Sequence, residues 1–281
     1  MKKKQMTIVF GIGFICTMLI CMTLLFRDVH AGQTVDALQI GKICVSQIYP
    51  DIKWETEEEK PNNGQMTAEK TAPEQKEPEP VDNSKPRVII YHTHSSESYQ
   101  PYSESNFHRE EETGTVREVG NVMTAELNRL GIAVVHDTTI HDRPSYNQSY
   151  DRSLETITAL LRQYPTAEVV IDLHRDAAAY TGNTGPTVTV NGETAAKYKF
   201  VIGQNNENYG QLYAFAEKVN AKAESMYPGF TGQILEKTYR YNEYIADQYL
   251  LLEVGNNQNS IEHAKTTGKY FAGILAAVLE E

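Results

Sequence analysis

The sequence predicts an α/β fold in which helices cover both faces of a mainly parallel, twisted sheet. Two observations lead to this fold class. Between residues 86 and 281, short apolar runs without polar alternation, typical of buried strands, alternate with longer segments in which apolar residues recur every three or four positions. Strands that alternate with helices along a chain are usually parallel neighbours in one sheet, because each helix carries the chain back across it.

The first half of this region is expected to supply three strands and two helices. In chain order they are strand 87–91 (RVIIY), helix 116–131 (VREVGNVMTAELNRLG), strand 132–137 (IAVVHD), helix 153–165 (SLETITALLRQYP) and strand 167–174 (AEVVIDLH). Gly131 suits the position just after a helix end, and Pro165 cannot continue a helix.

The second half is expected to supply a hairpin, two helices and a last buried strand. These elements are hairpin strands 187–190 and 197–203, helix 208–229, strand 248–255 (QYLLLEVG) and a C-terminal helix with apolar residues from Ile261 to Val278. The hairpin prediction depends on Asn191-Gly192, a dipeptide that favours tight two-residue turns.

The N-terminus differs from the rest in composition. Three lysines precede an uncharged, largely apolar run at 6–26, which is long enough to cross a bilayer as a helix. We expect 1–27 to be cytoplasmic lysines and a transmembrane anchor, 28–85 a juxtamembrane segment and a disordered acidic, Pro-rich tether, and 86–281 an extracytoplasmic folded domain. The alternative is a signal peptide cleaved near Ala31-Gly32.

Charge and cysteine content exclude two classes of protein. The formal net charge is −11, which argues against a broad nucleic-acid interface. Of the three cysteines, Cys16 and Cys21 lie in the apolar run and Cys44 stands alone, so residues 86–281 have neither a disulfide framework nor a CxxC zinc motif.

Candidate site residues follow three of the predicted strands. His92 and His94 follow the first, His174 ends the third, and Glu253 lies near the end of the last, while Glu118 lies in the first turn of the first helix. Ligands in open α/β sheets bind at the carboxyl ends of strands. A catalytic zinc needs three His, Asp or Glu ligands and an open position for water. His94, Glu118 and His174 suit those roles, and Glu253 suits that of a general acid/base.

Each of these residues also has a structural interpretation. A histidine at a strand end is often part of the packing, and a carboxylate in a first helical turn often serves the helix dipole. Arg175 either holds a substrate carboxylate or pairs with a neighbouring aspartate, and Glu97 either shapes the cleft or caps a turn. The tyrosines of 238–244 (TYRYNEY) either line a groove or stack in the core.

Five motifs, in this order and spacing, resemble the stage II sporulation protein P family. They are YHTHSSESY, REVGNVMTAEL, VVIDLHRDA, YPG and LLLEVGNNQNS. These proteins are membrane-anchored peptidoglycan hydrolases related to zinc-dependent N-acetylmuramoyl-L-alanine amidases. The resemblance implies an amidase-like fold, Zn²⁺ on His94, Glu118 and His174, and Glu253 as the catalytic carboxylate. His92 is the alternative first ligand, because alternation puts His92 and His94 on the same side if the strand continues. With His94 as the ligand, His92 is a substrate contact or a hydrogen-bond partner of a ligand.

The resemblance also implies a biological setting. It implies cleavage of the bond between N-acetylmuramic acid and L-alanine, endopeptidase activity on stem-peptide cross-links, and a location at the sporulation septum, where the wall is thinned for engulfment. The implied partners are a lytic transglycosylase of the same stage and a polytopic membrane protein. Two alternatives from other classes remain, a non-catalytic wall-binding scaffold and a zinc carboxypeptidase acting on stem peptides.

Overall fold

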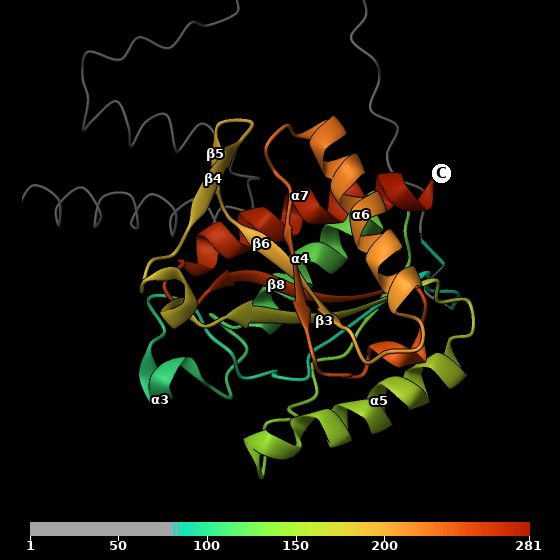
Figure 1. The fold of residues 1–281 in the computed structure, drawn as a ribbon, viewed down its shortest axis with the longest axis horizontal. Coiled ribbons are helices and arrows are strands. Elements are labelled where there is room, and N and C mark those ends of the chain that lie inside the picture. The colour runs from blue at the N-terminus through green and yellow to red at the C-terminus, as the bar shows by residue number, and fades with distance from the viewer. Residues whose placement is uncertain (1–80, 83) are drawn as a thin grey trace, which may run out of the picture. The chain divides into compact units, whose positions relative to one another are not determined.

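A six-stranded sheet forms the centre of the computed structural model, which describes residues 81–82 and 84–281 (Figure 1). Its strands are β1 (Val88–Tyr91), β2 (Val134–His136), β3 (Val169–Asp176), β6 (Tyr198–Gly203), β7 (Gln233–Lys237) and β8 (Tyr249–Asn256). They lie in the order β2-β1-β3-β8-β6-β7. The first four of that order are parallel, whereas β6 is antiparallel to β8 and parallel to β7. The predicted α/β fold with a mostly parallel sheet is confirmed, with one reversal of direction.

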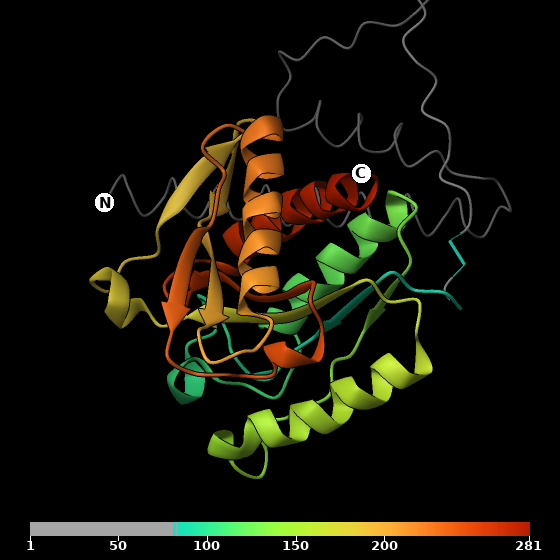
Figure 2. The same cartoon turned by 45° about the vertical axis from the view of Figure 1, so that its right-hand side comes forward.

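Helices cover both faces of this sheet (Figures 1 and 2). The long helices are α4 (Val116–Arg129), α5 (Ser149–Gln163), α6 (Tyr209–Met226) and α7 (Ile261–Leu279). Helix α7 packs against α4 and α6 on one face, and α5 lies on the other. The chain moves from β1 outward to β2 through α4 and back past β1 to β3 through α5. Because both crossovers are expected to be right-handed, they place their helices on opposite faces.

Short elements complete the described chain. They are α3 (Glu104–Phe107), the 3₁₀ turns η1 (Tyr146–Gln148), η2 (Ala178–Thr181) and η3 (Glu243–Ile245), and the strands β4 (Thr187–Val190) and β5 (Glu193–Ala196).

The hairpin differs from our expectation in its second strand. β4 pairs with β5, not with 197–203, and β6 instead joins the main sheet beside β8. Asn191 and Gly192 have φ of 48° and 83°, as a two-residue turn of this type requires. Such a turn pairs the residues directly before and after it. The weakly apolar segment ETAA at 193–196 is therefore the partner strand of β4. Strand β7, at the sheet edge and only half-buried, was not predicted.

The expected anchor at 6–26 and most of the expected tether at 28–85 lie outside the described residues. Among residues 81–82 and 84–281, no helix has the length and apolar character needed to cross a membrane.

Candidate functional site

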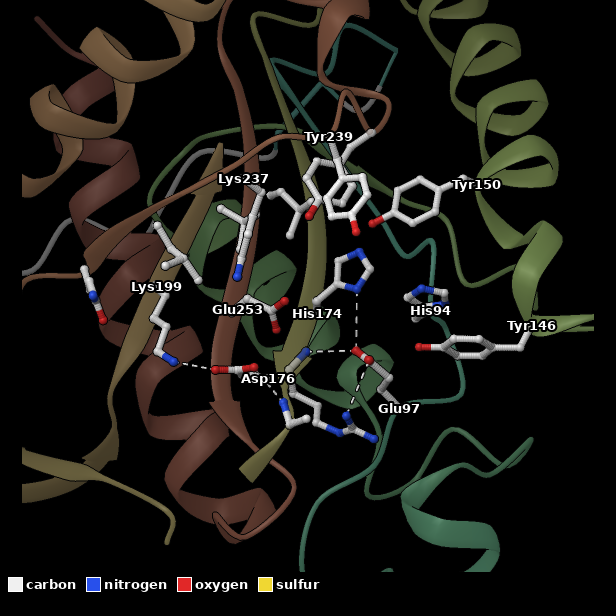
Figure 3. Close-up of a pocket in the computed structure, with 17 residues that line it drawn as sticks. His94, Glu97, Tyr146, Tyr150, His174, Asp176, Lys199, Lys237, Tyr239 and Glu253 are labelled. Atoms are coloured by element: carbon white, nitrogen blue, oxygen red, sulfur yellow. Dashed lines mark hydrogen bonds and ion pairs between the residues drawn. The ribbon is translucent and has the colours of Figure 1, made fainter. Parts of the chain in front are cut away.

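A pocket of about 600 Å³ lies on the α5 face of the sheet, over β3, β8, β6 and β7 (Figure 3). Alternation along β3 points His174 toward this face. His174 is the register partner of Glu253 on β8, and Glu253 is the partner of Lys199 on β6, so all three residues project on the same side. Other residues at the pocket are His94, Glu97, Tyr146, Tyr150, Lys237, Tyr239 and Tyr241.

His94 is held by a buried carboxylate and an aromatic ring. Its Nδ1 lies 3.0 Å from Oδ1 of Asp142, which leaves Nε2 as the nitrogen available to the pocket. The other oxygen of Asp142 accepts hydrogen bonds from the backbone N–H and the hydroxyl of Ser96, at 2.7 and 2.5 Å. Burial tends to raise the pKa of Asp142, but His94 and Ser96 outweigh it and hold that pKa well below its usual range. The Tyr146 ring stacks on His94 with centroids 4.0 Å apart.

His174 lies between two buried carboxylates. Its Nε2 is 2.9 Å from Oδ1 of Asp172. Its Nδ1 is 3.5 Å from Oε2 of Glu97, a contact that is marked in Figure 3. Asp172 is fixed in turn by the backbone N–H and hydroxyl of Thr93, at 2.7 and 2.6 Å. Burial tends to lower the pKa of His174, but the two carboxylates outweigh it and hold the pKa well above its usual range.

Glu97 is the carboxylate that the structure places with both histidines. Its side chain is 6% exposed, and the backbone N–H of Arg175 donates to its Oε2 over 2.9 Å. The Arg175 guanidinium lies 3.5 Å from its other oxygen. Burial tends to raise the pKa of Glu97, yet Arg175 and His174 outweigh it and the pKa is lowered. Glu97 is therefore an ionised carboxylate, the form that binds a metal.

Glu253 lies beside this group and is chemically unusual. Its Oε2 is buried and has no hydrogen-bond partner in the part of the chain that the structure describes. Burial raises its pKa to about 8, and Glu97 and Asp176 add to that effect while His174 opposes it. A buried polar atom without a partner costs free energy, so it is expected mainly where function requires it.

The structure does not bring Glu118 to this pocket, which corrects our expectation. Glu118 lies in the first turn of α4, on the opposite face of the sheet from the pocket. Its Oε1 is 3.1 Å from Nζ of Lys265 on α7, and its Oε2 accepts a hydrogen bond from the Gly114 N–H over 2.6 Å. The carboxylate thus caps the helix start and pairs across two helices, while Glu97 occupies the position next to His174.

His92 is also remote from the pocket. Its ring is buried. The Nδ1 atom of His92 lies 2.8 Å from the carbonyl oxygen of Leu173, and its Nε2 atom lies 2.7 Å from Nε2 of His136. The expected role at a ligand or substrate does not fit this placement. The reason is that β1 ends at Tyr91, so the alternation that would put His92 and His94 on one side does not continue.

Arg175 reaches the pocket wall, but its guanidinium is already engaged. It donates to the carbonyl oxygens of Ser98 and Phe107, at 3.2 and 3.0 Å, besides facing Glu97. The side chain therefore holds the loop after β1 in place, and the expectation that it binds a substrate carboxylate does not fit.

Several residues at the site carried no recognisable signal in the sequence. Asp142, Tyr146 and Tyr150 come from the connection before α5 and from α5 itself, and Lys199 and Lys237 come from β6 and β7. Only their positions in space relate them to the histidines. Of the tyrosines for which the sequence allows either a groove or a core position, Tyr239 and Tyr241 line the pocket.

The segment that carries these tyrosines is fastened on both sides. The Asn242 amide donates to the carbonyl oxygen of Tyr150 and to the hydroxyl of Ser153, at 3.1 and 3.0 Å. Glu243 accepts a hydrogen bond from the Gly203 N–H over 2.7 Å. A Cβ at Gly203 would lie 2.4 Å from the carbonyl oxygen of Tyr239, which is too close for any other residue.

Two pairwise spacings in this donor set match those of zinc ligands. In the described residues, no group of three or more His, Cys, Asp or Glu side chains is arranged so that it could hold a metal ion as it stands. Two ligand atoms on one tetrahedral zinc lie about 3.4 Å apart, and Nδ1 of His174 and Oε2 of Glu97 are 3.5 Å apart. Two imidazoles on one such ion have ring centroids about 5 Å apart, and those of His94 and His174 are 5.4 Å apart. His94 also hydrogen-bonds Asp142 through its second nitrogen, as is usual for metal-binding histidines, and Nε2 of His174 lies 2.9 Å from Asp172.

Comparison with known proteins identifies the family. The sequence model of stage II sporulation protein P matches residues 40–276. The stage II sporulation protein P of Bacillus subtilis (strain 168) is 27% identical over 244 residues, which are 81% of this chain and 60% of that protein. The chain thus matches less than two thirds of this relative's length.

Two solved amidase structures are more distant. One is the apo form of the N-acetylmuramyl-L-alanine amidase Ami1 from Mycobacterium abscessus, with a TM-score of 0.43 and 14% identity, over 69% of this chain and 99% of that one. The other is the CwlD amidase from Clostridioides difficile in complex with the GerS lipoprotein, with a TM-score of 0.43 and 10% identity, over 69% and 96%. The family match covers most of the chain, which therefore belongs to the stage II sporulation protein P family.

Proposed function

We propose that this chain is a peptidoglycan hydrolase of sporulation that cleaves the amide bond between N-acetylmuramic acid and L-alanine. Family membership supports the biological setting. The observation that carries the chemistry is the spacing of His94 and His174, with ring centroids 5.4 Å apart, and of His174 and Glu97, 3.5 Å apart, beside a carboxyl oxygen of Glu253 that has no hydrogen-bond partner in the described residues.

His94, His174 and Glu97 would hold the zinc ion. When bound, zinc supplies a water of lowered pKa and polarises the amide carbonyl. Asp142 and Asp172 orient the two imidazoles, so that one nitrogen of each ring faces the pocket. Glu97 replaces Glu118 as the third ligand in this proposal.

Glu253 would act as the general base and then as the general acid. It takes a proton from the attacking water and passes it to the departing amine nitrogen. Its pKa of about 8 lies near the working pH, where a carboxyl group transfers protons in both directions most effectively.

The remaining parts of the proposal come from the family resemblance. They are cleavage of stem-peptide cross-links, anchoring by a membrane helix at 6–26, action at the sporulation septum, and partnership with a lytic transglycosylase and a polytopic membrane protein. The carboxypeptidase alternative is less well supported, because the guanidinium of Arg175 is occupied by Glu97 and two carbonyl groups.

Digestion of purified sacculi with the full chain and Zn²⁺, followed by mass spectrometry of the products, tests the proposal. Free stem peptides with an L-alanine amino end support the amidase, and severed bridges support endopeptidase activity. Loss of only a terminal residue would favour a carboxypeptidase, and intact sacculi would favour a scaffold. The Glu253→Gln variant is the matched control for contaminating hydrolases.

A further inference from the structure

A buried hydrogen-bond network lies on the Nε2 side of His174. It consists of four side chains that are at most 4% exposed: Thr93 after β1, Ser153 on α5, Asp172 on β3 and Asn242 in the segment 238–244. We propose that Thr93, Ser153 and Asn242 are positioning residues, which hold His174 in the orientation of a zinc ligand without touching the metal. This inference rests on the proposed function and adds residues to its zinc site.

The direction of each hydrogen bond in this network follows from the number of protons available. The Thr93 hydroxyl has one proton, which it donates to Oδ2 of Asp172 over 2.6 Å. The hydroxyl of Ser153 lies 2.8 Å from the same oxygen of Thr93, so Ser153 is the donor in that contact. Ser153 in turn accepts a hydrogen bond from the Asn242 amide over 3.0 Å. All three bonds therefore run the same way, from the amide of Asn242 to the carboxylate of Asp172.

Asp172 is held by both of its oxygens. The backbone N–H of Thr93 donates to Oδ1 over 2.7 Å, and the Thr93 hydroxyl donates to Oδ2. The Tyr249 hydroxyl adds a contact of 3.3 Å to Oδ2. Because the carboxylate cannot turn without losing a hydrogen bond, Nε2 of His174, 2.9 Å from Oδ1, has one favourable position. The opposite nitrogen of the ring, Nδ1, is thereby directed at Glu97 and the pocket.

The far end of the network belongs to the pocket wall. Asn242 directly follows Tyr241, which lines the pocket, and its amide also donates to the carbonyl oxygen of Tyr150 over 3.1 Å. The four members come from positions 93, 153, 172 and 242, so the network closes only when the end of β1, α5, β3 and this wall are all in place. Hydrogen bonds in such a series strengthen one another. We therefore expect the wall and His174 to be positioned together.

A purely structural role makes a different prediction from a positioning role. Buried polar groups need partners in any protein, and removing one partner lowers stability. A structural network would therefore lower the melting temperature of a variant and leave the zinc affinity of its folded form unchanged. A positioning network lowers the zinc affinity as well, because an imidazole that is free to rotate loses part of its binding free energy in becoming ordered.

Zinc affinity of the full chain, measured by competition with a chelating dye well below the melting temperature, tests the proposal. Thr93→Val keeps the shape of the side chain and removes the hydroxyl, and we expect it to lower the affinity about 10-fold. Thr93→Ser keeps the hydroxyl and should bind zinc like the unaltered chain. Thr267→Val is the matched control. Thr267 is fully buried on α7, and its hydroxyl donates to the carbonyl oxygen of Ala196 over 2.7 Å, so this variant should lose stability but not zinc affinity.

A double-mutant cycle tests whether the members act as one network. Ser153→Ala and Asn242→Ala should each lower zinc affinity about 3-fold. The double variant should also lose about 3-fold rather than about 9-fold, because either change interrupts the same series of hydrogen bonds. Losses that multiply would show independent effects and overturn the network.

Unchanged zinc affinity in Thr93→Val would overturn the positioning role, and so would an equal loss in Thr267→Val. Ser153→Ala takes the place of Thr93→Val in this comparison if the latter does not fold. Failure of the unaltered chain to bind zinc is a separate result, which would refute the zinc site of the proposed function and the role of the network with it. Zinc binding that none of the network variants weakens would refute the network alone.

Discussion

Nδ1 of His94 lies 3.0 Å from Oδ1 of Asp142, a carboxylate that also accepts hydrogen bonds from Ser96 and Ser149. This contact fixes the plane of the imidazole and makes its other nitrogen a better donor to a metal. We expect Asp142→Asn to lower zinc affinity by about 10- to 100-fold. Competition with a chelating dye measures the affinity. Asp137→Asn, an acidic residue outside the pocket, should bind zinc normally, and equal affinities in the two variants would contradict the role of Asp142.

Glu97 and Glu118 are the two candidates for the third zinc ligand, and their substitution is expected to have different effects on zinc binding. Glu97→Gln should lose bound zinc because the amide is a much poorer ligand than an ionised carboxylate. Glu118→Gln should keep it, because Glu118 faces Lys265 on the other side of the sheet. Metal content by mass spectrometry and thermal melting of both variants decide the question. Zinc loss in Glu118→Gln, with the fold intact, would restore the original expectation.

Glu253→Gln should separate metal binding from turnover. The substitution keeps the shape of the side chain and removes its proton-carrying carboxyl group, so kcat is expected to fall by about 10²- to 10⁴-fold. Zinc content should stay at the level of the unaltered chain. A variant with full activity on muramoyl peptides would remove Glu253 from the mechanism.

Removal of the metal should stop hydrolysis reversibly. Treatment with a chelator is expected to abolish release of stem peptides, and added Zn²⁺ should restore it. His174→Ala should stay inactive after zinc is added, because it lacks a ligand. Persistent activity in fully metal-free protein, checked by metal analysis, would refute the zinc mechanism.

Glu243 should make stability depend on pH. Burial raises its pKa to about 8 from an ordinary value of 4.5, although Gly203 and Asn206 donate hydrogen bonds to it. Between these two values the folded chain keeps a proton that the unfolded chain releases. The free energy of unfolding therefore falls as pH rises, by up to about 1.4 kcal/mol per pH unit.

The Glu243→Gln variant cannot lose this proton and should show a flatter pH dependence. Urea unfolding of both proteins between pH 5 and 9 measures the difference, which should widen in favour of the variant toward pH 8. Parallel curves would mean that the carboxyl of Glu243 titrates normally in the folded chain.

The elements that the sequence predicted well are those with local signals. β3 and β8 are runs of Val, Ile and Leu because helices or loops cover both of their faces. α4 ends at Arg129, and Gly131 follows just beyond the helix end with φ of 83°, as expected for a glycine in that position. His94, His174 and Glu253 could be predicted as site residues because each lies in the last residues of a strand or just beyond one. Their roles remain predictions.

The site predictions that the structure corrects concern residues whose partners lie far away in the sequence. Nothing local distinguishes Glu97 from a turn-capping residue; its importance comes from Arg175, which lies 78 residues later. Glu118 opens a helix after the first strand, as a ligand would, but the long connection after β1 brings Glu97 to the pocket and leaves Glu118 facing α7. Asp142 was missed for the same reason, since its partner His94 is 48 residues earlier.

Gly203 controls the geometry of the pocket without lining it. A methyl group at this position would collide with the backbone of Tyr239 and with the carboxylate of Glu243. The segment that carries Tyr239 and Tyr241 packs directly on the backbone of β6. The two backbones are so close that only the hydrogen atom of a glycine fits between them. The width of the pocket on its tyrosine side therefore depends on this glycine, and any larger residue would push that wall away from the sheet.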